Sequence, residues 1–428
     1  MILVEAAVDS PADRQRLIGV CFQWKEVLYN TPSLWTTLSL CTYYPNDEQL
    51  RQLFDNLSSR LSRCGSLMLE VKLNLVGLQE THKASLFALL SEKAPFTRWR
   101  SLELWEREDR LLTPSMLENM GDFRNLERLD VYAIVRGQLL RIVSESATSK
   151  LGELAIRSWI HPDQFEADIN GLLKYIRRLE LSEQYPSIKL PANIVELTMS
   201  KFPPMSLPYI KMLTFTSRQS VTDLSDVAFP NLTSLTVSFL PIPQRMMPSS
   251  TTLSNVESLM VYGSEFGALA YLSLPKLRRL AIKDPPSLAP HSWEIDSLMN
   301  AIIQDEFSLS PSEEFDLGFP VDSGTLTLAA IKMPHAKKVV INVEDVKKDW
   351  VGVVESFNDA NLGLLRVDGS ALSTKYLLIK SNGQLHEPET LRIAKKVLMK
   401  LGSTGITMLK ILPKGSRGLI VTRNDIDR

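Results

Sequence analysis

One spacing of apolar residues recurs along most of this chain of 428 residues. In each copy an apolar residue, two variable residues and a leucine are followed by one variable residue and a second apolar residue. The clearest copies run from WRSLEL to LRRLAI, and their central leucines lie 16 to 27 residues apart. These leucines are Leu102, Leu129, Leu154, Leu179, Leu197, Leu213, Leu235, Leu259 and Leu280. Weaker copies centre on Leu38, Leu67, Val339, Leu365 and Leu409.

The spacing predicts one short β-strand per copy, because residues two apart point to the same face of a strand. So short a strand cannot bury its apolar face alone, whereas strands stacked in parallel bury it against one another. The alternative is that these copies are ordinary buried strands, in which a leucine two positions before an apolar residue is common. Nine successive copies at this spacing favour a repeat architecture instead. We therefore expect an α/β fold, namely an irregular leucine-rich-repeat solenoid with outer helices over residues 36–428.

Several segments depart from a regular repeat. No Asn or Cys stands three residues after the second apolar position of the nine copies, so no asparagine ladder is expected there. The rhythm breaks at about residues 284–320, where we predict a helix over Ser292–Gln304 and an acidic serine loop over Asp305–Asp316. Ser310 precedes Pro311 in that loop and is a candidate phosphorylation site. Further helices are predicted over Thr113–Phe123 and His386–Gly402, from their caps and apolar spacing.

The N-terminal segment has the helical period instead. Ser10 can cap a helix that has Pro11 at its first position and Asp13 in its first turn. The apolar residues that follow form a single stripe, and Thr31-Pro32 ends the predicted helix. Cys21 lies inside this stripe, which favours a packed side chain over a nucleophile. The stripe consists of Leu17, Val20, Cys21, Trp24, Val27 and Leu28.

Composition and charge narrow the possible partners. The net charge of -1 offers no broad attraction for nucleic acid or an anionic membrane. No apolar run is long enough to cross a bilayer, and the N-terminus lacks the basic region of a signal peptide. The three cysteines form no CxxC pair and indicate reduced thiols. We therefore expect a cytoplasmic or nuclear protein that binds neither nucleic acid nor membrane.

The sequence offers no recognisable catalytic chemistry. Its five histidines are too scattered to form an HExxH or HxH metal pair, and no GxSxG, GxGxxG or P-loop motif is present. The glycine-containing stretch from Leu401 to Lys410 is best interpreted as a turn between a helix and a strand. We therefore predict no catalytic residues, no cofactor, no metal site and no enzymatic activity.

Residues Asp13 to Leu40 resemble the second half of an F-box from the fungal-type F-box proteins with leucine-rich repeats. Members of that family have a Val-Cys-x-x-Trp helix, then Thr-Pro-x-Leu-Trp, then the first strand of the repeats. The resemblance covers about a tenth of the chain. The matching residues are Val20, Cys21, Trp24, Thr31, Pro32, Leu34 and Trp35.

The resemblance implies a non-catalytic substrate-recognition subunit of an SCF-type ubiquitin ligase. Such a subunit binds the SCF adaptor subunit, of the S-phase kinase-associated protein family, through its F-box and an unknown protein substrate through its repeats. Residues 1–35 would then be partial F-box helices. The Leu-Pro-x-Glu-Ile opening of the family is missing, which implies a truncated or degenerate F-box. The adaptor-binding residues implied are Leu17, Val20, Cys21, Trp24, Leu28 and Pro32.

Two functions stay open at this point. The first is the ligase subunit, with Trp24 and Leu28 left free for the adaptor and Trp35 packed under the first repeat. The second is a stand-alone leucine-rich-repeat interaction scaffold that carries a vestigial F-box. Both functions need a partner surface, which the outward residues of the strands would supply on the concave face. Because interface hot spots favour Trp, Tyr and Arg, we predict partner binding at Trp105, Arg128, Tyr132, Arg157 and Arg178.

The alternative for these five residues is purely structural. In it, the two aromatic side chains lie under the N-terminal helices, and the arginines only pair with Glu and Asp on neighbouring strands.

Overall fold

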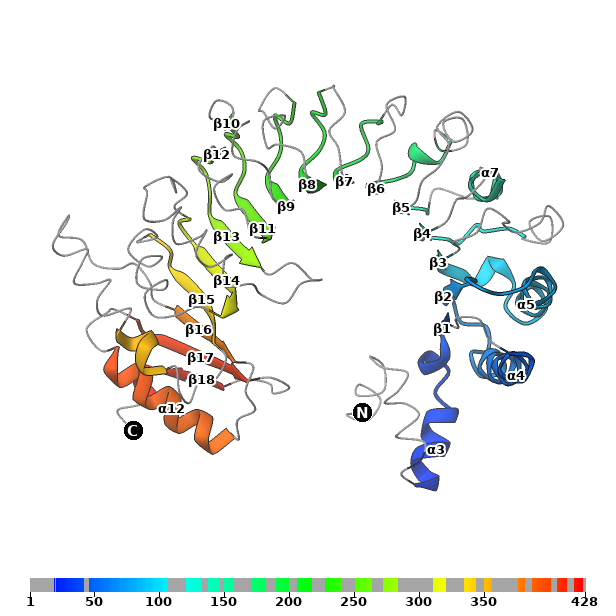
Figure 1. Ribbon diagram of the computed structural model, residues 1–428, viewed down its shortest axis with the longest axis horizontal. Helices are drawn as coiled ribbons and strands as arrows, with labels where there is room; N and C mark the ends of the chain where they lie inside the picture. Colours follow the sequence, from blue (N-terminus) through cyan, green and yellow to red (C-terminus); the bar gives the residue numbers. More distant parts are fainter. Residues whose placement is uncertain are drawn as a thin grey trace. The chain divides into compact units, whose positions relative to one another are not determined.

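A computed structural model describes most of the expected strands and several helices. The described residues are 19, 21–41, 46–105, 121–132, 138–146, 150–157, 169, 171–181, 190–199, 206–217, 228–239, 251–263, 272–283, 311–320, 335–343, 350–355, 376–381, 387–401, 406–413 and 419–425. They form an α/β structure whose strands are mostly parallel (Figure 1). The chain divides into two compact units, Met1–Thr198 and Met199–Arg428.

The strands of the first unit follow one another in chain order, and each described pairing among them is parallel. The central leucines of the sequence repeat share one register, in which Leu102 pairs with Leu129, Leu129 with Leu154 and Leu154 with Leu179. All four are buried. The strands are β1 (Thr37–Cys41), β2 (Leu69–Asn74), β3 (Trp99–Trp105), β4 (Arg128–Tyr132), β5 (Glu153–Ile156), β6 (Arg178–Leu181) and β7 (Glu196–Met199).

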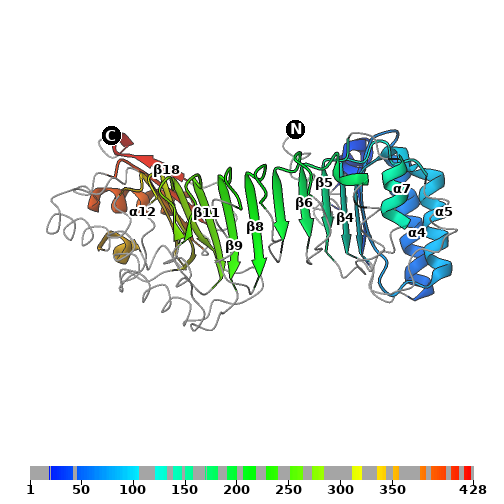
Figure 2. The same cartoon turned by 90° about the horizontal axis from the view of Figure 1, so that it is seen from above.

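Helices lie together on one side of the strands of this sheet (Figure 2), and among the described residues no helix lies over the other face, which we call the open face. They are α4 (Asp47–Arg63), α5 (Glu80–Lys93) and α7 (Gln138–Ser146). A capping box starts α4, since the Asn46 side chain accepts from the Gln49 N–H while the Gln49 side chain accepts from the Asn46 N–H. The core lies on the helix side of the sheet, where the alternate residues of β2 and the inner side of α5 are buried.

The second unit continues the pattern. Leu213, Leu235, Leu259 and Leu280 share one parallel register and are buried. The main strands are β8 (Met212–Ser217), β9 (Ser234–Phe239), β11 (Ser258–Gly263), β13 (Arg279–Lys283), β14 (Glu314–Pro320), β15 (Lys338–Val343), β16 (Tyr376–Ser381), β17 (Met408–Pro413) and β18 (Leu419–Thr422). Two short strands, β10 (Thr251–Thr252) and β12 (Leu272–Ser273), pair separately.

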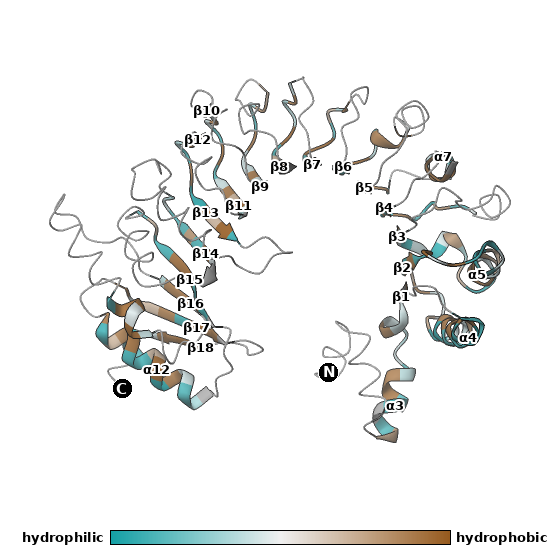
Figure 3. Cartoon of the chain, in the orientation of Figure 1, coloured by the Kyte–Doolittle hydropathy of each residue, from teal (hydrophilic) through white to brown (hydrophobic). Residues whose placement is uncertain are grey.

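At the end of the second unit the strand pairing changes from parallel to antiparallel. β18 runs antiparallel to β17, and helix α12 (Glu387–Lys400) packs against both strands. Figure 3 shows hydrophilic and hydrophobic residues along α12, as expected for a helix with one buried side. The predicted helix over His386–Gly402 is therefore confirmed.

An asparagine ladder does exist, but it lies before the strands. Asn125, Asn193, Asn231 and Asn255 each stand four residues before a central leucine. Their side-chain amides donate to backbone carbonyls of the preceding repeat, for example Asn231 to Pro208 at 2.7 Å and Asn255 to Pro230 at 2.8 Å. The remaining bonds run from Asn125 to Thr97 and from Asn193 to Leu173 and Ile176. The asparagines therefore join successive repeats from the turn before each strand, not from the turn after it.

Several predicted elements need correction. Leu67 is not the centre of a strand, because the register places Val71 opposite Leu38, and Leu67 is exposed before β2 begins. Residues 314–316 belong to β14 rather than to a loop, because Phe315 and Leu317 alternate inward with Asp316 between them. Most of the predicted helices at 113–123 and 292–304, the candidate phosphosite Ser310 and the weak copy at Leu365 lie outside the described residues. The predicted division after residue 35 stays a prediction.

The N-terminal helix is also shorter than predicted. Helix α3 (Phe22–Tyr29) starts after Cys21, whose backbone is extended, so a single helix through Cys21 is wrong. Gly19 and Val20 just before this point are poor helix formers, which explains the break. The predicted end is confirmed: the residues from Pro32 to Trp35 form a short 3-10 helix, η1, that leads into β1.

Candidate interaction surface

The open face of the first unit carries most of the charged and aromatic candidates. Parallel register stacks equivalent residues across the strands: Arg128 pairs with Glu153 and Glu153 with Arg178, while Glu103 pairs with Asp130. We call this surface the charged face. It consists of Glu70, Lys72, Glu103, Trp105, Arg128, Asp130, Tyr132, Glu153, Arg157, Arg178, Glu180 and Glu196.

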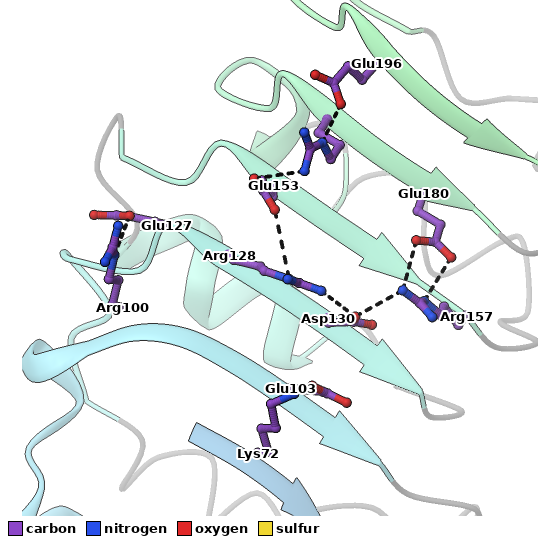
Figure 4. A network of polar contacts seen from close by, with 11 residues as sticks. Lys72, Arg100, Glu103, Glu127, Arg128, Asp130, Glu153, Arg157, Glu180 and Glu196 are labelled. Atoms are coloured by element: carbon purple, nitrogen blue, oxygen red, sulfur yellow. Dashed lines mark hydrogen bonds and ion pairs between the residues drawn. The ribbon is translucent and has the colours of Figure 1, made fainter. Parts of the chain in front are cut away.

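An alternating chain of ion pairs crosses four strands of the charged face (Figure 4). Arg128 Nε lies 4.0 Å from Glu153 Oε2, and Arg178 Nη1 lies 3.3 Å from Glu153 Oε1. Arg178 Nε also contacts Glu196 on β7. Each of these pairs is partly exposed, so each contributes little to stability in isolation. Together they fix the directions of the side chains.

Arg157, which directly follows β5, connects the charged and aromatic parts of the face. Its guanidinium contacts Glu180 at 2.9 Å and Asp130 at 3.4 Å. It also lies 4.8 Å from the centroid of the Tyr132 ring and donates a hydrogen bond to the Tyr132 hydroxyl. A guanidinium held at once by two carboxylates and an aromatic ring has little freedom to rotate.

Trp105 and Tyr132 form a stacked pair at the ends of β3 and β4. Their ring centroids lie 3.6 Å apart and their planes differ by 16°. The indole Nε1 of Trp105 donates to Glu103 Oε1 at 2.8 Å, and Glu103 in turn binds Lys72 at 2.8 Å. Trp105 is nevertheless 37% exposed, which is unusual for a tryptophan in a sheet. The indole is thus both oriented and accessible.

The pKa values of three carboxyl groups near this aromatic pair depart from their ordinary values. Asp130 is only 2% exposed, and its burial raises its pKa above the ordinary value despite the nearby guanidinium of Arg157. Burial likewise raises the pKa of Glu180. Burial would raise the pKa of Glu103 too, but hydrogen bonds from Lys72 and Trp105 outweigh it and lower that pKa.

All five predicted partner-binding residues lie on the charged face. The arginines pair with carboxylates on their own and neighbouring strands, as the structural alternative required. The aromatic pair, in contrast, is not covered by the described N-terminal helices, since Trp105 is exposed and Tyr132 is partly so. The five residues therefore share one surface, and their role in binding a partner stays a prediction.

Only some of the predicted adaptor-binding residues are exposed in the structure. Leu17, Val20 and the side chain of Trp24 lie outside the described residues. Pro32 is exposed as expected. Cys21 is exposed, so the prediction that it packs inside an apolar stripe is wrong, because the helix does not extend through it. Leu28 is 3% exposed, so it is not free to contact an adaptor.

Trp35 explains why Leu28 is buried. The Trp35 indole Nε1 donates to the Leu28 carbonyl at 2.9 Å, which draws the end of α3 against the buried indole. The Trp35 carbonyl accepts from Cys64 Sγ at the end of α4, and Arg63 lies over the Trp35 ring. The predicted inward packing of Trp35 is confirmed.

Two apolar residues of α3 are strongly exposed, and only Val27 belongs to the predicted stripe. Phe22 is 72% exposed and Val27 is 50% exposed. Phe22 lies outside the stripe because it is only one or two residues away from Val20, Cys21 and Trp24, and residues so spaced point to other sides of a helix. The true start of the helix could not be derived from apolar spacing alone.

The described residues contain no group of His, Cys, Asp and Glu that could hold a metal ion. Among the same residues, no helix has the length and apolar character needed to cross a bilayer. No family model matches the chain, and no curated protein matches it.

Proposed function

We propose that this protein is the non-catalytic substrate-recognition subunit of an SCF-type ubiquitin ligase. The observation that carries the proposal is that α3, directly before a regular series of parallel strands, leaves the apolar side chains of Phe22 and Val27 exposed. An exposed aromatic side chain can serve as the anchor of a protein interface once a partner covers it. In the F-box proteins that the sequence resembles, this segment contacts the adaptor subunit.

The junction between α3 and the strands also suits this role. Trp35 joins the end of α3 to α4 and to the start of β1, so a protein bound to α3 would be held close to the repeats. The repeats themselves, interpreted as irregular leucine-rich repeats, would then present the charged face to a substrate. Trp24 remains a proposed adaptor contact along with Phe22 and Val27, whereas Leu28 does not.

Capture of the purified adaptor subunit by the immobilised protein tests this function. We expect capture by the wild type, and a loss of roughly tenfold or more in affinity for Phe22→Ala, Trp24→Ala and Val27→Ala if these are hot-spot residues. Matched controls are Met399→Ala and Val351→Ala, which truncate exposed apolar residues in the second unit and should leave capture unchanged. Wild-type protein that captures no adaptor would contradict the proposal.

A second function is favoured by a separate observation. The charged face consists of strand residues and Arg157, which directly follows β5, and it involves no residue of α3, so it could serve a stand-alone interaction scaffold equally well. Absence of adaptor capture, together with binding of a protein partner to the charged face, would support the scaffold.

A further inference from the structure

Two carboxylates face each other at one corner of the charged face. Glu103 on β3 and Asp130 on β4 are register partners, and neighbouring strands lie about 4.8 Å apart. Like charges directly opposite each other destabilise a sheet. Their side chains alternate with the buried Leu102, Leu104, Leu129 and Val131, so both extend from the open face.

The protein's own cations contact only some of the carboxylate oxygens of Glu103 and Asp130. Lys72 binds Glu103, while Arg128 and Arg157 both approach the same oxygen of Asp130, Oδ2, at 3.4 Å. The other oxygen, Oδ1, is buried and has no hydrogen-bond partner among the described residues. A buried carboxylate oxygen without a donor is costly, so the protein's own cations leave this corner short of hydrogen-bond donors.

The wider charge balance selects the sign of that molecule. The charged face holds six carboxylates and four cations. Arg128, Arg157 and Arg178 each contact two carboxylates already, so an anionic partner would have to break existing pairs. A cationic partner would instead add to an incomplete set. The carboxylates are Glu70, Glu103, Asp130, Glu153, Glu180 and Glu196, and the cations are Lys72, Arg128, Arg157 and Arg178.

Trp105 supplies the second element of a cation site. The Glu103 carboxylate holds its indole N–H, and its ring is stacked and exposed beside the two carboxylates. Guanidinium and ammonium groups bind over aromatic rings, most strongly over tryptophan, and they pair with carboxylates at the same time. Because the ring is already fixed, binding would cost little side-chain entropy.

We infer that the corner formed by Glu103, Asp130 and Trp105 binds an arginine or lysine side chain from a partner protein. This inference rests on the proposed function in that the partner is the protein that the repeats recognise. Lys72 occupies part of the corner and competes with the incoming side chain for Glu103.

Fluorescence anisotropy of a labelled Gly-Ser peptide that carries several arginines tests the inference directly. The full-length protein is titrated into this peptide, and into the same peptide with glutamate in place of arginine. We expect the arginine peptide to bind, more weakly as salt is added, and the glutamate peptide to bind far less. Preference for the glutamate peptide would overturn the inference.

Variants locate the binding at this corner. Glu103→Gln and Trp105→Ala should each weaken binding of the arginine peptide by roughly tenfold. Matched controls are Glu313→Gln, which removes an ion-paired carboxylate from the second unit, and Tyr209→Ala, which removes an exposed aromatic ring there. Unchanged binding in both Glu103→Gln and Trp105→Ala would place the peptide elsewhere and refute the site.

Weaker peptide binding in these two variants could also come from misfolding, and a third variant separates the two explanations. Lys72→Met removes the competing cation, whose side chain is half exposed, and should strengthen binding of the arginine peptide severalfold. A misfolded variant cannot gain affinity in this way, and no gain would contradict the proposed competition. The peptide assay contains no adaptor, so it can succeed while adaptor capture fails, and the two proposals are tested separately.

Discussion

At the scale of single residues, neighbours across the sheet decide what each charged side chain does. Sequence alternation correctly placed Arg128, Asp130 and Tyr132 on one face. It could not show that Asp130 would be buried while Arg128 stays half exposed, because that depends on which rotamers fill the space around them. It also missed the ladder formed by Asn125 and its equivalents, whose bonds reach a different repeat.

The raised pKa of Asp130 predicts a pH-dependent stability. Burial favours the protonated carboxyl in the folded state, so Asp130 contributes stability below its ordinary pKa that is lost as the pH rises through the raised value. The free energy of unfolding of the wild type, relative to Asp130→Asn, should therefore fall as the pH rises above about 4, the ordinary pKa of an aspartate. Denaturant titrations across this range measure it. A relative stability that stays constant or rises with pH would show that the pKa of Asp130 is not raised.

At the scale of elements, short segments proved harder to predict than the strands. The strand at each central leucine follows from a period of two that burial enforces. The start of α3 does not follow from its apolar period, because Gly19, Val20 and Cys21 interrupt a pattern that looks continuous. Helices α4 and α5 fill the spaces before β2 and β3, where the sequence repeat indicated only that a connection was needed.

Trp35 should be the main anchor of this N-terminal region. Trp35→Ala removes a buried ring and its bond to Leu28, so we expect a loss of about 3–5 kcal/mol in the free energy of unfolding. Trp35→Phe keeps most of the ring and should cost less. Trp105→Ala is the matched comparison, and it should cost far less because that ring is partly exposed. Equal losses for Trp35→Ala and Trp105→Ala in denaturant unfolding would contradict this role.

At the scale of the whole molecule, the repeat was predicted and its irregular parts were not. The expected interruption ended sooner than predicted, since β14 already pairs with β13 through Leu280 and Phe315. β16 (Tyr376–Ser381) and β18 (Leu419–Thr422) do not follow from the repeat, because Thr374 and Ser416 stand where an apolar residue should precede the leucine by three positions. Each becomes a strand through its backbone pairing with a neighbouring strand, β16 with β15 and β17, and β18 with β17.

The antiparallel strand β18 should protect the last parallel strand. A chain that ends after Pro413 loses β18 and leaves one edge of β17 unpaired, so we expect it to self-associate. Light scattering at rising protein concentration measures the effect. A chain that ends after Asp425 keeps β18 and serves as the control. Identical scattering from the two proteins would show that β18 has no protective role.

The spacing of the strand partners has a further consequence for how the protein folds during synthesis. In the second unit, Leu213, Leu235, Leu259 and Leu280 meet partners that are 22, 24 and 21 residues away. The entropy lost on closing a loop depends only weakly on its length, so each added strand pays nearly the same cost. Every strand can therefore dock as soon as the next short stretch of chain leaves the ribosome, and low contact order favours rapid, sequential folding from the N-terminal side.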